Sequence, residues 1–249
     1  MKLEITWLGH ASFKIRDERG TVLYIDPWIT ENPSCTTKIE EINDANIVCV
    51  THGHFDHFGD SLAIVKRTGA KLVCSPDIGW YAHSKGVERE KESVTMDIGG
   101  CVHIENIEIC MVQAIHTCEL YGEEWISEKK ILPGGGSCGF VFKFSDAANS
   151  LNVYYAGDTD VFADMKTIAE LHEPHISILP IGDKYTMGVR GAALAASWLR
   201  SKVVIPMHFG TFPALAQDPN HYIRLVKKKA PDAEVIVLNP GQSYLWGEA

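Results

Sequence analysis

The chain has 249 residues, of which 45% are hydrophobic and 22% are charged, and its formal net charge is −9. This length supports a large buried core, and the ordinary composition excludes a disordered, collagen-like or coiled-coil protein. The acidic balance disfavours nucleic acid as a partner, because the mean charge of the protein repels a polyanion. The sequence lacks both an apolar run of the roughly 18 residues that span a bilayer and a secretory signal, so we expect a cytoplasmic protein without a membrane partner.

The cysteines follow no paired pattern. There are 7 of them, an odd number, and none forms a CxxC pair. Cys49, Cys74 and Cys110 lie inside apolar, strand-like runs. Buried reduced thiols explain this distribution better than a disulfide framework does.

The first half of the chain is dominated by short β-rich runs. We predict strands at residues 3–8, 12–16, 21–25, 45–50 and 71–74. A hairpin turn at 17–20 joins the second and third of these strands. A helix follows the strand at 45–50, with Asp60 as its N-cap and Gly69 at its end. Ser75-Pro76 ends the strand at 71–74.

The second half repeats this arrangement of several strands followed by helices and strands. We predict strands at 107–115, 139–144, 151–156, 176–181, 202–206 and 234–238, and helices at 189–199 and 220–229. Two sheets with helices outside would bury all of these runs, so the sequence predicts an α/β protein with a four-layer αβ/βα sandwich in a single domain, residues 1–249. The segment 119–137 shows no sustained period, which fits either a functional loop over a site or a simple surface excursion.

The densest group of polar side chains is the motif Thr51-His52-Gly53-His54-Phe55-Asp56-His57, directly after the strand predicted at 45–50. Its three imidazoles and one carboxylate suit zinc, iron or manganese. His52 and His54 project to the same side if the chain stays extended. The motif therefore predicts a metal site.

Further metal-ligand side chains follow other predicted strands. His116 follows the strand at 107–115, Asp158 the strand at 151–156, and His208 the strand at 202–206. Paired sheets bring such strand ends to one edge, so we expect these residues to complete the site.

The order His52-x-His54-x-Asp56-His57, His116, Asp158, His208 resembles the metallo-β-lactamase superfamily along essentially the whole chain. Gly9-His10-Ala11-Ser12, Asp26-Pro27, Pro180-Ile181-Gly182 and the run 206–213 resemble a branch of uncharacterised metal-dependent hydrolases similar to L-ascorbate-6-phosphate lactonase.

The resemblance implies a binuclear centre of two divalent transition-metal ions. It implies one ion bound by His52, His54 and His116, and a second bound by Asp56, His57 and His208, with Asp158 shared by both. We expect zinc first, with manganese, iron or nickel as alternatives. Asp26 is interpreted either as a residue that orients a ligand imidazole or as the start of a turn.

The expected reaction is hydrolysis of an ester, lactone or phosphoester of a small molecule by a metal-bound hydroxide. Asp56 is the expected proton carrier, and His10 is expected near the reaction as a catalytic, supporting or structural residue. Lys184, Tyr185 and Thr186 are candidate substrate contacts, although a connecting loop explains them equally well. An iron-dependent oxidoreductase of the dioxygenase type and a nuclease are the alternatives, and a homo-oligomer stays open.

Overall fold

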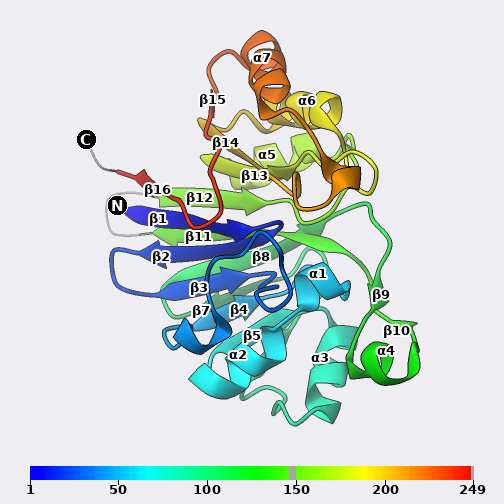
Figure 1. Cartoon of the computed structure of the whole chain (residues 1–249). Coiled ribbons are helices and arrows are strands. Elements are labelled where there is room, and N and C mark those ends of the chain that lie inside the picture. The colour runs from blue at the N-terminus through cyan, green and yellow to red at the C-terminus, as the bar shows by residue number, and fades with distance from the viewer. Residues whose placement is uncertain (146–149, 248–249) are drawn as a thin grey trace. The chain divides into compact units, whose positions relative to one another are not determined.

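The structure is a computed structural model that describes residues 1–145 and 150–247. The chain folds as two compact units, each built around its own sheet (Figure 1). Unit 1 comprises Met1, Ile98–His116 and Cys138–Asn239, and unit 2 comprises Lys2–Asp97, Thr117–Ser137 and Pro240–Ala249. The single domain over residues 1–249 stays a prediction.

Unit 2 is built on a mixed sheet with the strand order β16-β1-β2-β3-β4-β5-β6. Strands β16, β1, β2 and β3 pair antiparallel, and β3 to β6 pair parallel. Its strands are β1 (Leu3–Gly9), β2 (Ser12–Asp17), β3 (Val22–Ile25), β4 (Ile47–Cys49), β5 (Lys71–Cys74), β6 (Ser93–Thr95) and β16 (Ser243–Trp246).

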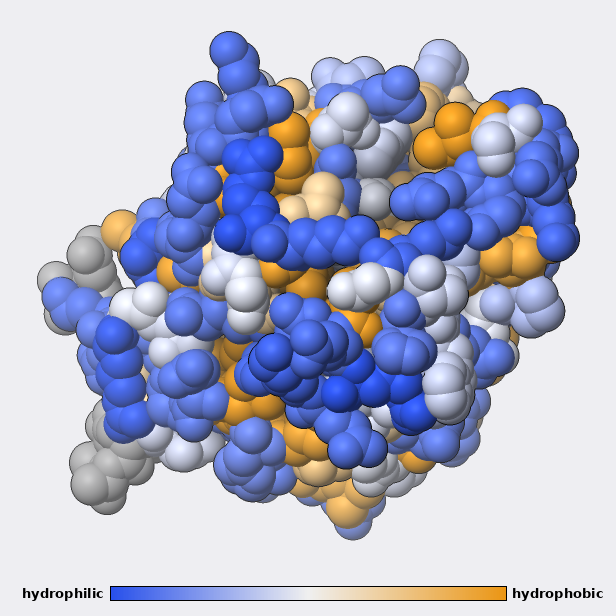
Figure 2. Space-filling model, turned by 90° about the horizontal axis from the view of Figure 1, so that it is seen from below, coloured by the Kyte–Doolittle hydropathy of each residue, from blue (hydrophilic) through white to orange (hydrophobic). Residues whose placement is uncertain are grey.

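Short helices follow the parallel strands of unit 2. They are α1 (Phe55–Phe58), α2 (Ser61–Thr68) and α3 (Pro76–Ser84), with the 3-10 helix η1 (Ile39–Glu41) before β4. Ile64 of α2 and Ile78 of α3 pack with Val48 and Leu72 of the sheet in one buried cluster. The opposite, solvent side of these helices belongs to the face in Figure 2, which is largely hydrophilic with separate hydrophobic patches.

The segment expected to be irregular contains short elements, so that prediction is wrong in part. It holds β9 (Glu119–Leu120), α4 (Glu123–Glu128) and β10 (Leu132–Pro133), and β9 pairs antiparallel with β10. Tyr81 of α3 fixes α4, because its hydroxyl donates to Glu124 Oε2 at 2.9 Å and accepts from the backbone N–H of Glu123 at 2.8 Å.

Unit 1 repeats the mixed pattern, with the strand order β15-β14-β13-β12-β11-β8-β7. Strands β7, β8, β11 and β12 pair antiparallel, and β12 to β15 pair parallel. Its strands are β7 (Cys101–Ile104), β8 (Ile107–Gln113), β11 (Cys138–Ser145), β12 (Ser150–Tyr155), β13 (Ile176–Pro180), β14 (Val203–Met207) and β15 (Glu234–Val235).

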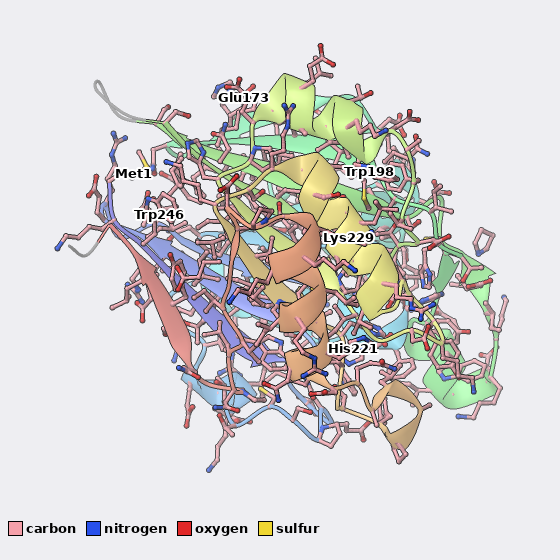
Figure 3. All side chains as sticks on the ribbon, turned by 90° about the horizontal axis from the view of Figure 1, so that it is seen from above. Met1, Glu173, Trp198, His221, Lys229 and Trp246 are labelled. Atoms are coloured by element: carbon pink, nitrogen blue, oxygen red, sulfur yellow. A yellow bond between two sulfur atoms is a disulfide. The ribbon has the colours of Figure 1, made fainter. Side chains whose placement is uncertain are left out.

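Helices α5 (Met165–His172), α6 (Val189–Leu199) and α7 (Pro219–Lys229) cover one face of this sheet, and the 3-10 helix η2 (Pro213–Leu215) precedes α7. Ala192 of α6 and Tyr222 of α7 are fully buried in one cluster with Val204 of β14. Figure 3 shows this layer from above, with Trp198 on α6 and Lys229 on α7.

Several predicted elements differ in their ends or their number. The strand predicted at 45–50 shortens to β4 (Ile47–Cys49), and α3 was not predicted because Ser75-Pro76 was interpreted only as a strand end. Ser75 occupies the N-cap position of α3 without a capping bond from its side chain, and proline lies in the first turn. Asp60 occupies the N-cap position of α2 without capping it, because its carboxylate accepts the backbone N–H groups of Ile29 and Thr30.

The prediction that Cys110 is a reduced thiol is wrong. Cys101 and Cys110 form a disulfide between β7 and β8. The antiparallel register places these residues directly opposite each other, with 4.0 Å between their Cα atoms. Cys49 and Cys74 are buried and belong to no disulfide, as expected. Among the described residues, no helix is both long enough and apolar enough to cross a membrane.

Candidate metal centre

The candidate ligands of unit 2 lie at the carboxyl ends of its strands. His10 follows β1, Asp26 follows β3, and the histidine motif follows β4 and runs into α1. Strands β1, β3 and β4 run in the same direction, so these ends share one edge of the sheet. This edge is where sheets of helix-and-strand proteins bind their ligands.

A buried carboxylate organises this edge. Asp26 is fully buried, and its oxygens accept the Thr51 backbone N–H at 2.8 Å, the Thr51 hydroxyl at 2.7 Å and His57 Nδ1 at 2.8 Å. Asp26 thus contacts the imidazole of His57 directly, whereas its role in orienting a metal ligand stays a prediction. Because the neutral His57 ring carries a single proton, the bond from Nδ1 leaves a lone pair on Nε2.

The same reasoning applies to His52 and His54. The Thr51 hydroxyl gives its proton to Asp26, so it accepts from His52 Nδ1 at 2.9 Å. His54 Nε2 donates to Glu119 Oε2 at 2.8 Å. These bonds place the remaining lone pairs on His52 Nε2 and His54 Nδ1, and those two atoms lie 3.0 Å apart.

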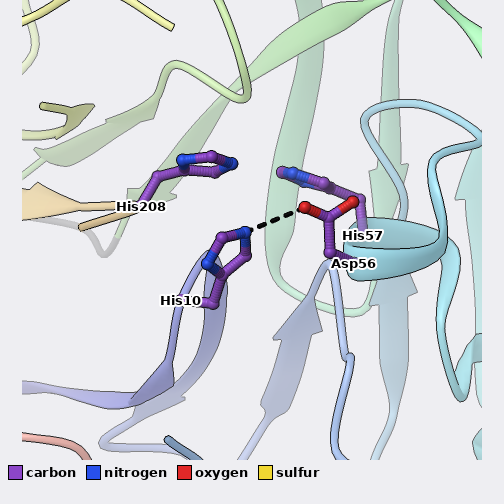
Figure 4. Close-up of side chains that lie close together, drawn as sticks. All are labelled: His10, Asp56, His57 and His208. Atoms are coloured by element: carbon purple, nitrogen blue, oxygen red, sulfur yellow. Dashed lines mark hydrogen bonds and ion pairs between the residues drawn. The ribbon is translucent and has the colours of Figure 1, made fainter. Parts of the chain in front are cut away.

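His10 contacts the carboxylate of the motif. His10 Nε2 lies 2.9 Å from Asp56 Oδ2, and Figure 4 shows this bond beside His57 of the same turn. His10 is fully buried, and its ring packs edge-on against Trp28 with 5.4 Å between centroids. Ligand atoms of His10, Asp56 and His57 lie within 4.8 Å of one another.

Unit 1 brings its own candidates together. His208 Nε2 lies 3.0 Å and His116 Nε2 lies 3.6 Å from the same oxygen of Asp158, Oδ2. The Asp158 side chain is only 3% exposed. His116, Asp158 and His208 follow β8, β12 and β14, which run in the same direction, as the sequence predicted.

Three of these residues have a left-handed backbone. His10, Asp26 and His208 have φ angles of 56°, 46° and 57°. Residues other than glycine rarely adopt this backbone conformation, and those that do are often found at functional sites. Gly182 adds a tight approach, because a Cβ there would lie 2.4 Å from the His208 carbonyl oxygen.

Glu119 was missed by the sequence analysis. It lies in β9, far along the chain from His54, and its hydrogen bond to that imidazole lowers the pKa of the Glu119 carboxyl. A glutamate in an irregular stretch gives no signal of its own, and only the tertiary contact identifies it.

The predicted substrate residues lie on the loop between β13 and α6. Lys184 and Tyr185 are exposed, with the Lys184 Nζ 5.2 Å from the centre of the Tyr185 ring. Thr186 is buried, and its hydroxyl donates to the Met187 carbonyl oxygen at 3.3 Å. Their contact with a substrate stays a prediction.

The donor set fits transition-metal ions. His52 Nε2 and His54 Nδ1 lie 3.0 Å apart, which is close enough for one cation to bind both nitrogens. Imidazole nitrogen and carboxylate oxygen are typical donors to such ions. A histidine that binds a metal ion through one ring nitrogen usually donates a hydrogen bond from the other.

Comparison with known proteins agrees with this interpretation. A family model described as a β-lactamase superfamily domain matches residues 4–208. A UPF0173 metal-dependent hydrolase of Methanopyrus kandleri is 43% identical over 242 residues, covering 97% of this chain and 99% of that protein. A UPF0173 metal-dependent hydrolase of Koribacter versatilis is 41% identical over 242 residues, with 97% of each protein covered.

A solved structure agrees over the whole chain. Igni18, described as a novel metallo hydrolase from Ignicoccus hospitalis, matches with a TM-score of 0.84 and 34% identity, covering 100% of both chains. The predicted αβ/βα class of fold and the predicted superfamily are confirmed, whereas the narrower similarity to a lactonase stays a prediction. The chain belongs to the β-lactamase superfamily as one of its metal-dependent hydrolases.

Proposed function

We propose that this protein hydrolyses an ester, lactone or phosphoester of a small molecule with two divalent transition-metal ions. The proposed ligands are His52, His54 and His116 for one ion, and Asp56, His57 and His208 for the other, with Asp158 shared. Zinc is the first expectation for both ions. The observation that carries the proposal is the 3.0 Å distance between His52 Nε2 and His54 Nδ1 in the turn after β4.

Bound ions would lower the pKa of water toward neutrality and offset the negative charge that develops on the substrate. Residues of the chain orient the proposed ligands. Asp26 and Glu119 fix the rings of His57 and His54 through hydrogen bonds of 2.8 Å each. Such outer partners set the ring orientation and the protonated nitrogen.

Asp56 and His10 are proposed as the proton-handling pair. The hydrogen bond between His10 Nε2 and Asp56 Oδ2 is 2.9 Å long, so a proton taken up by the carboxylate has a route to a neighbouring base. The buried position of His10 excludes bulk water from its side of this bond. The names of the relatives support hydrolysis rather than the redox alternative.

Metal analysis of the purified protein tests the proposal. We expect close to two transition-metal ions per chain, and fewer after Asp158→Ala. Asp160→Ala is the matched control, because Asp160 is exposed two residues away. Equal metal content in the two variants would contradict the shared-ligand role of Asp158.

An activity screen tests the reaction itself. Protein reloaded with Zn²⁺ or Mn²⁺ should cleave at least one member of a panel of aryl esters, lactones and phosphodiesters, and His54→Ala should abolish that cleavage. Cleavage retained in His54→Ala would place the chemistry elsewhere.

A further inference from the structure

A cavity of about 510 Å³ lies within unit 2, beside the histidine motif. Its walls come from the turn after β3, from α1 and from the segment around α4. Half of its ten lining residues have aromatic or aliphatic side chains, namely Trp28, Phe55, Tyr121, Trp125 and Ile126.

Three of these aromatic residues also contact candidate ligands or adjoin them. The Trp28 ring lies 5.4 Å from the His10 ring, and the Tyr121 ring lies 5.5 Å from the His54 ring, centroid to centroid. Phe55 lies between His54 and Asp56 in the chain. A group bound in the cavity therefore contacts aromatic rings that themselves pack against His10 and His54.

The charges in the lining disfavour an anionic group. Glu31 and Asp60 carry carboxylates, whereas Lys129 supplies the ammonium group. Lys129 Nζ already lies 5.2 Å from the centre of the Trp125 ring. A phosphate here would meet more negative than positive charge, which is unfavourable.

Ile126 is the side chain of the wall that most strongly indicates an apolar ligand. It is 78% exposed although it is large and apolar, and it lines the cavity from α4. A neutral apolar ligand would remove this surface from water, which is favourable in proportion to the area buried.

We propose that this cavity binds a neutral aromatic or aliphatic group of the substrate and places the adjoining ester or lactone bond at the histidine motif. This inference rests on the proposed function and narrows it, because it selects neutral apolar carboxylic esters and lactones over phosphorylated small molecules.

Binding to the metal-free protein tests the cavity without any catalysis. The probe is 2-naphthylmethanol, a neutral aromatic alcohol, titrated by calorimetry into chelator-treated protein. We expect saturable binding that Ile126→Asp weakens roughly tenfold or more, because it introduces a charge into the apolar wall. Ile131→Asp is the matched control, since Ile131 is an exposed isoleucine of the same segment outside the cavity wall, and it should leave binding within about twofold.

Trp125→Leu is the second variant, which keeps the wall apolar while removing the ring, and it should weaken binding by a smaller factor than Ile126→Asp. Absence of saturable binding to the unmodified protein, or equal affinities in Ile126→Asp and Ile131→Asp, would overturn the cavity proposal. 2-Naphthyl phosphate binding more tightly than 2-naphthylmethanol would overturn its neutral class.

Kinetics of the reloaded enzyme separate the two proposals. With p-nitrophenyl hexanoate we expect Ile126→Asp to raise KM about tenfold with a smaller change in kcat, and Ile131→Asp to change neither. Hydrolysis that is identical in both variants would refute the cavity and leave the hydrolase standing. Probe binding with the expected variant pattern, but no hydrolysis of any ester or lactone, would refute the proposed reaction and leave the cavity as a binding site for apolar groups.

Discussion

At the scale of single residues, the hydrogen-bond partners of the imidazoles decide which nitrogen can bind a metal ion. Asp26 acts on two rings, directly on His57 and through the Thr51 hydroxyl on His52. Asp26 is fully buried, and hydrogen bonds from the Thr51 N–H, the Thr51 hydroxyl and His57 Nδ1 stabilise its carboxylate there. The backbone of Asp26 is left-handed at this position, with a φ of 46°.

Glu119 gives the first prediction. Glu119→Ala removes the carboxylate that accepts from His54 Nε2 at 2.8 Å, so the ring loses its fixed orientation and its fixed proton. We expect metal affinity to fall about 10–100-fold, as is typical for an outer partner of a ligand histidine. Glu119→Gln keeps an acceptor oxygen and should lose less. Competition with a chromophoric chelator measures both affinities.

Glu128→Ala is the control for Glu119, because Glu128 is an exposed glutamate at the end of α4. It should leave metal affinity unchanged. If Glu119→Ala retained the affinity of the unmodified protein while His54→Ala lost it, the role of Glu119 as a positioning residue would be wrong.

The sequence reveals the residues of the site unevenly. The motif His52–His57 is recognisable because several candidate metal ligands lie in one short segment. His116, Asp158 and His208 are recognisable because each follows an apolar strand. Glu119 and the role of Asp26 depend on pairing between distant segments. Local sequence patterns do not predict which distant segments pair, so these contacts are identified only in the folded structure.

At the scale of elements, β9 packs tightly on the turn that carries the histidine motif. The Tyr121 N–H donates to the Gly53 carbonyl oxygen at 2.9 Å. A Cβ at Gly53 would lie 2.7 Å from the Glu119 carbonyl oxygen and 2.8 Å from the Leu120 Cα. Glycine is therefore required at position 53 for close backbone approach.

Gly53→Ala gives the second prediction. The added methyl group must displace β9 or the histidine turn, so we expect a loss of about 1–3 kcal/mol in the free energy of unfolding, measured with urea on the metal-free protein. Gly136→Ala is the matched control, because a Cβ there meets nothing within 4 Å. Equal stabilities of the two variants would contradict the tight packing of β9.

Helix α3 shows why some elements escaped prediction. Ser75-Pro76 ends β5 and also starts α3, since serine suits the N-cap and proline the first helical turn. The dipeptide alone fits both a strand end and a helix start. The helix is recognised only from its packing, in which Ile78 and Ala82 are buried. Helix α4 is six residues long and is held mainly by tertiary contacts. No periodic pattern in the sequence predicts such contacts.

The contacts of α4 give the third prediction. Glu124 accepts from Lys85 Nζ at 2.6 Å and from the Tyr81 hydroxyl at 2.9 Å, and these bonds lower the pKa of its carboxyl to about 2. Because the folded pKa lies below the usual value of 4.5, the stabilisation is full above about pH 4.5 and is lost as the pH falls toward 2. Amide hydrogen exchange of α4 should therefore accelerate on acidification, after correction for intrinsic rates.

Glu124→Gln tests the cause of this pH dependence. The variant carries no titrating carboxyl at position 124, so the protection of α4 should be weaker at pH 6 and should change less between pH 5 and pH 3. Glu128→Gln should behave like the unmodified protein. An unaltered pH profile in Glu124→Gln would show that another group controls α4.

At the scale of the whole molecule, the two units share one plan. Each has antiparallel strands followed by parallel strands with helices, and each places candidate ligands at the carboxyl ends of its strands. The sequence predicted this recurrence because the strands and helices of each half carry their own periodic patterns. It did not predict the disulfide between Cys101 and Cys110, because the register of β7 against β8 is set by pairing rather than by cysteine spacing.

Metal removal gives the last prediction. The proposed ligands come from segments far apart in the sequence, so the unfolded chain does not present them together and the ions bind the folded state selectively. At a free metal concentration of about 100 times Kd, each bound ion stabilises the fold by about 2.7 kcal/mol, so metal loading raises Tm by at least roughly 5–10 °C for a chain of this size. Dialysis against a chelator should lower Tm by this amount, and added Zn²⁺ or Mn²⁺ should restore it. Asp158→Asn should show a much smaller response to metal and Asp160→Ala a full one, as measured by scanning calorimetry. A Tm of the unmodified protein that is insensitive to chelator and to added metal would contradict selective binding of ions by the native chain.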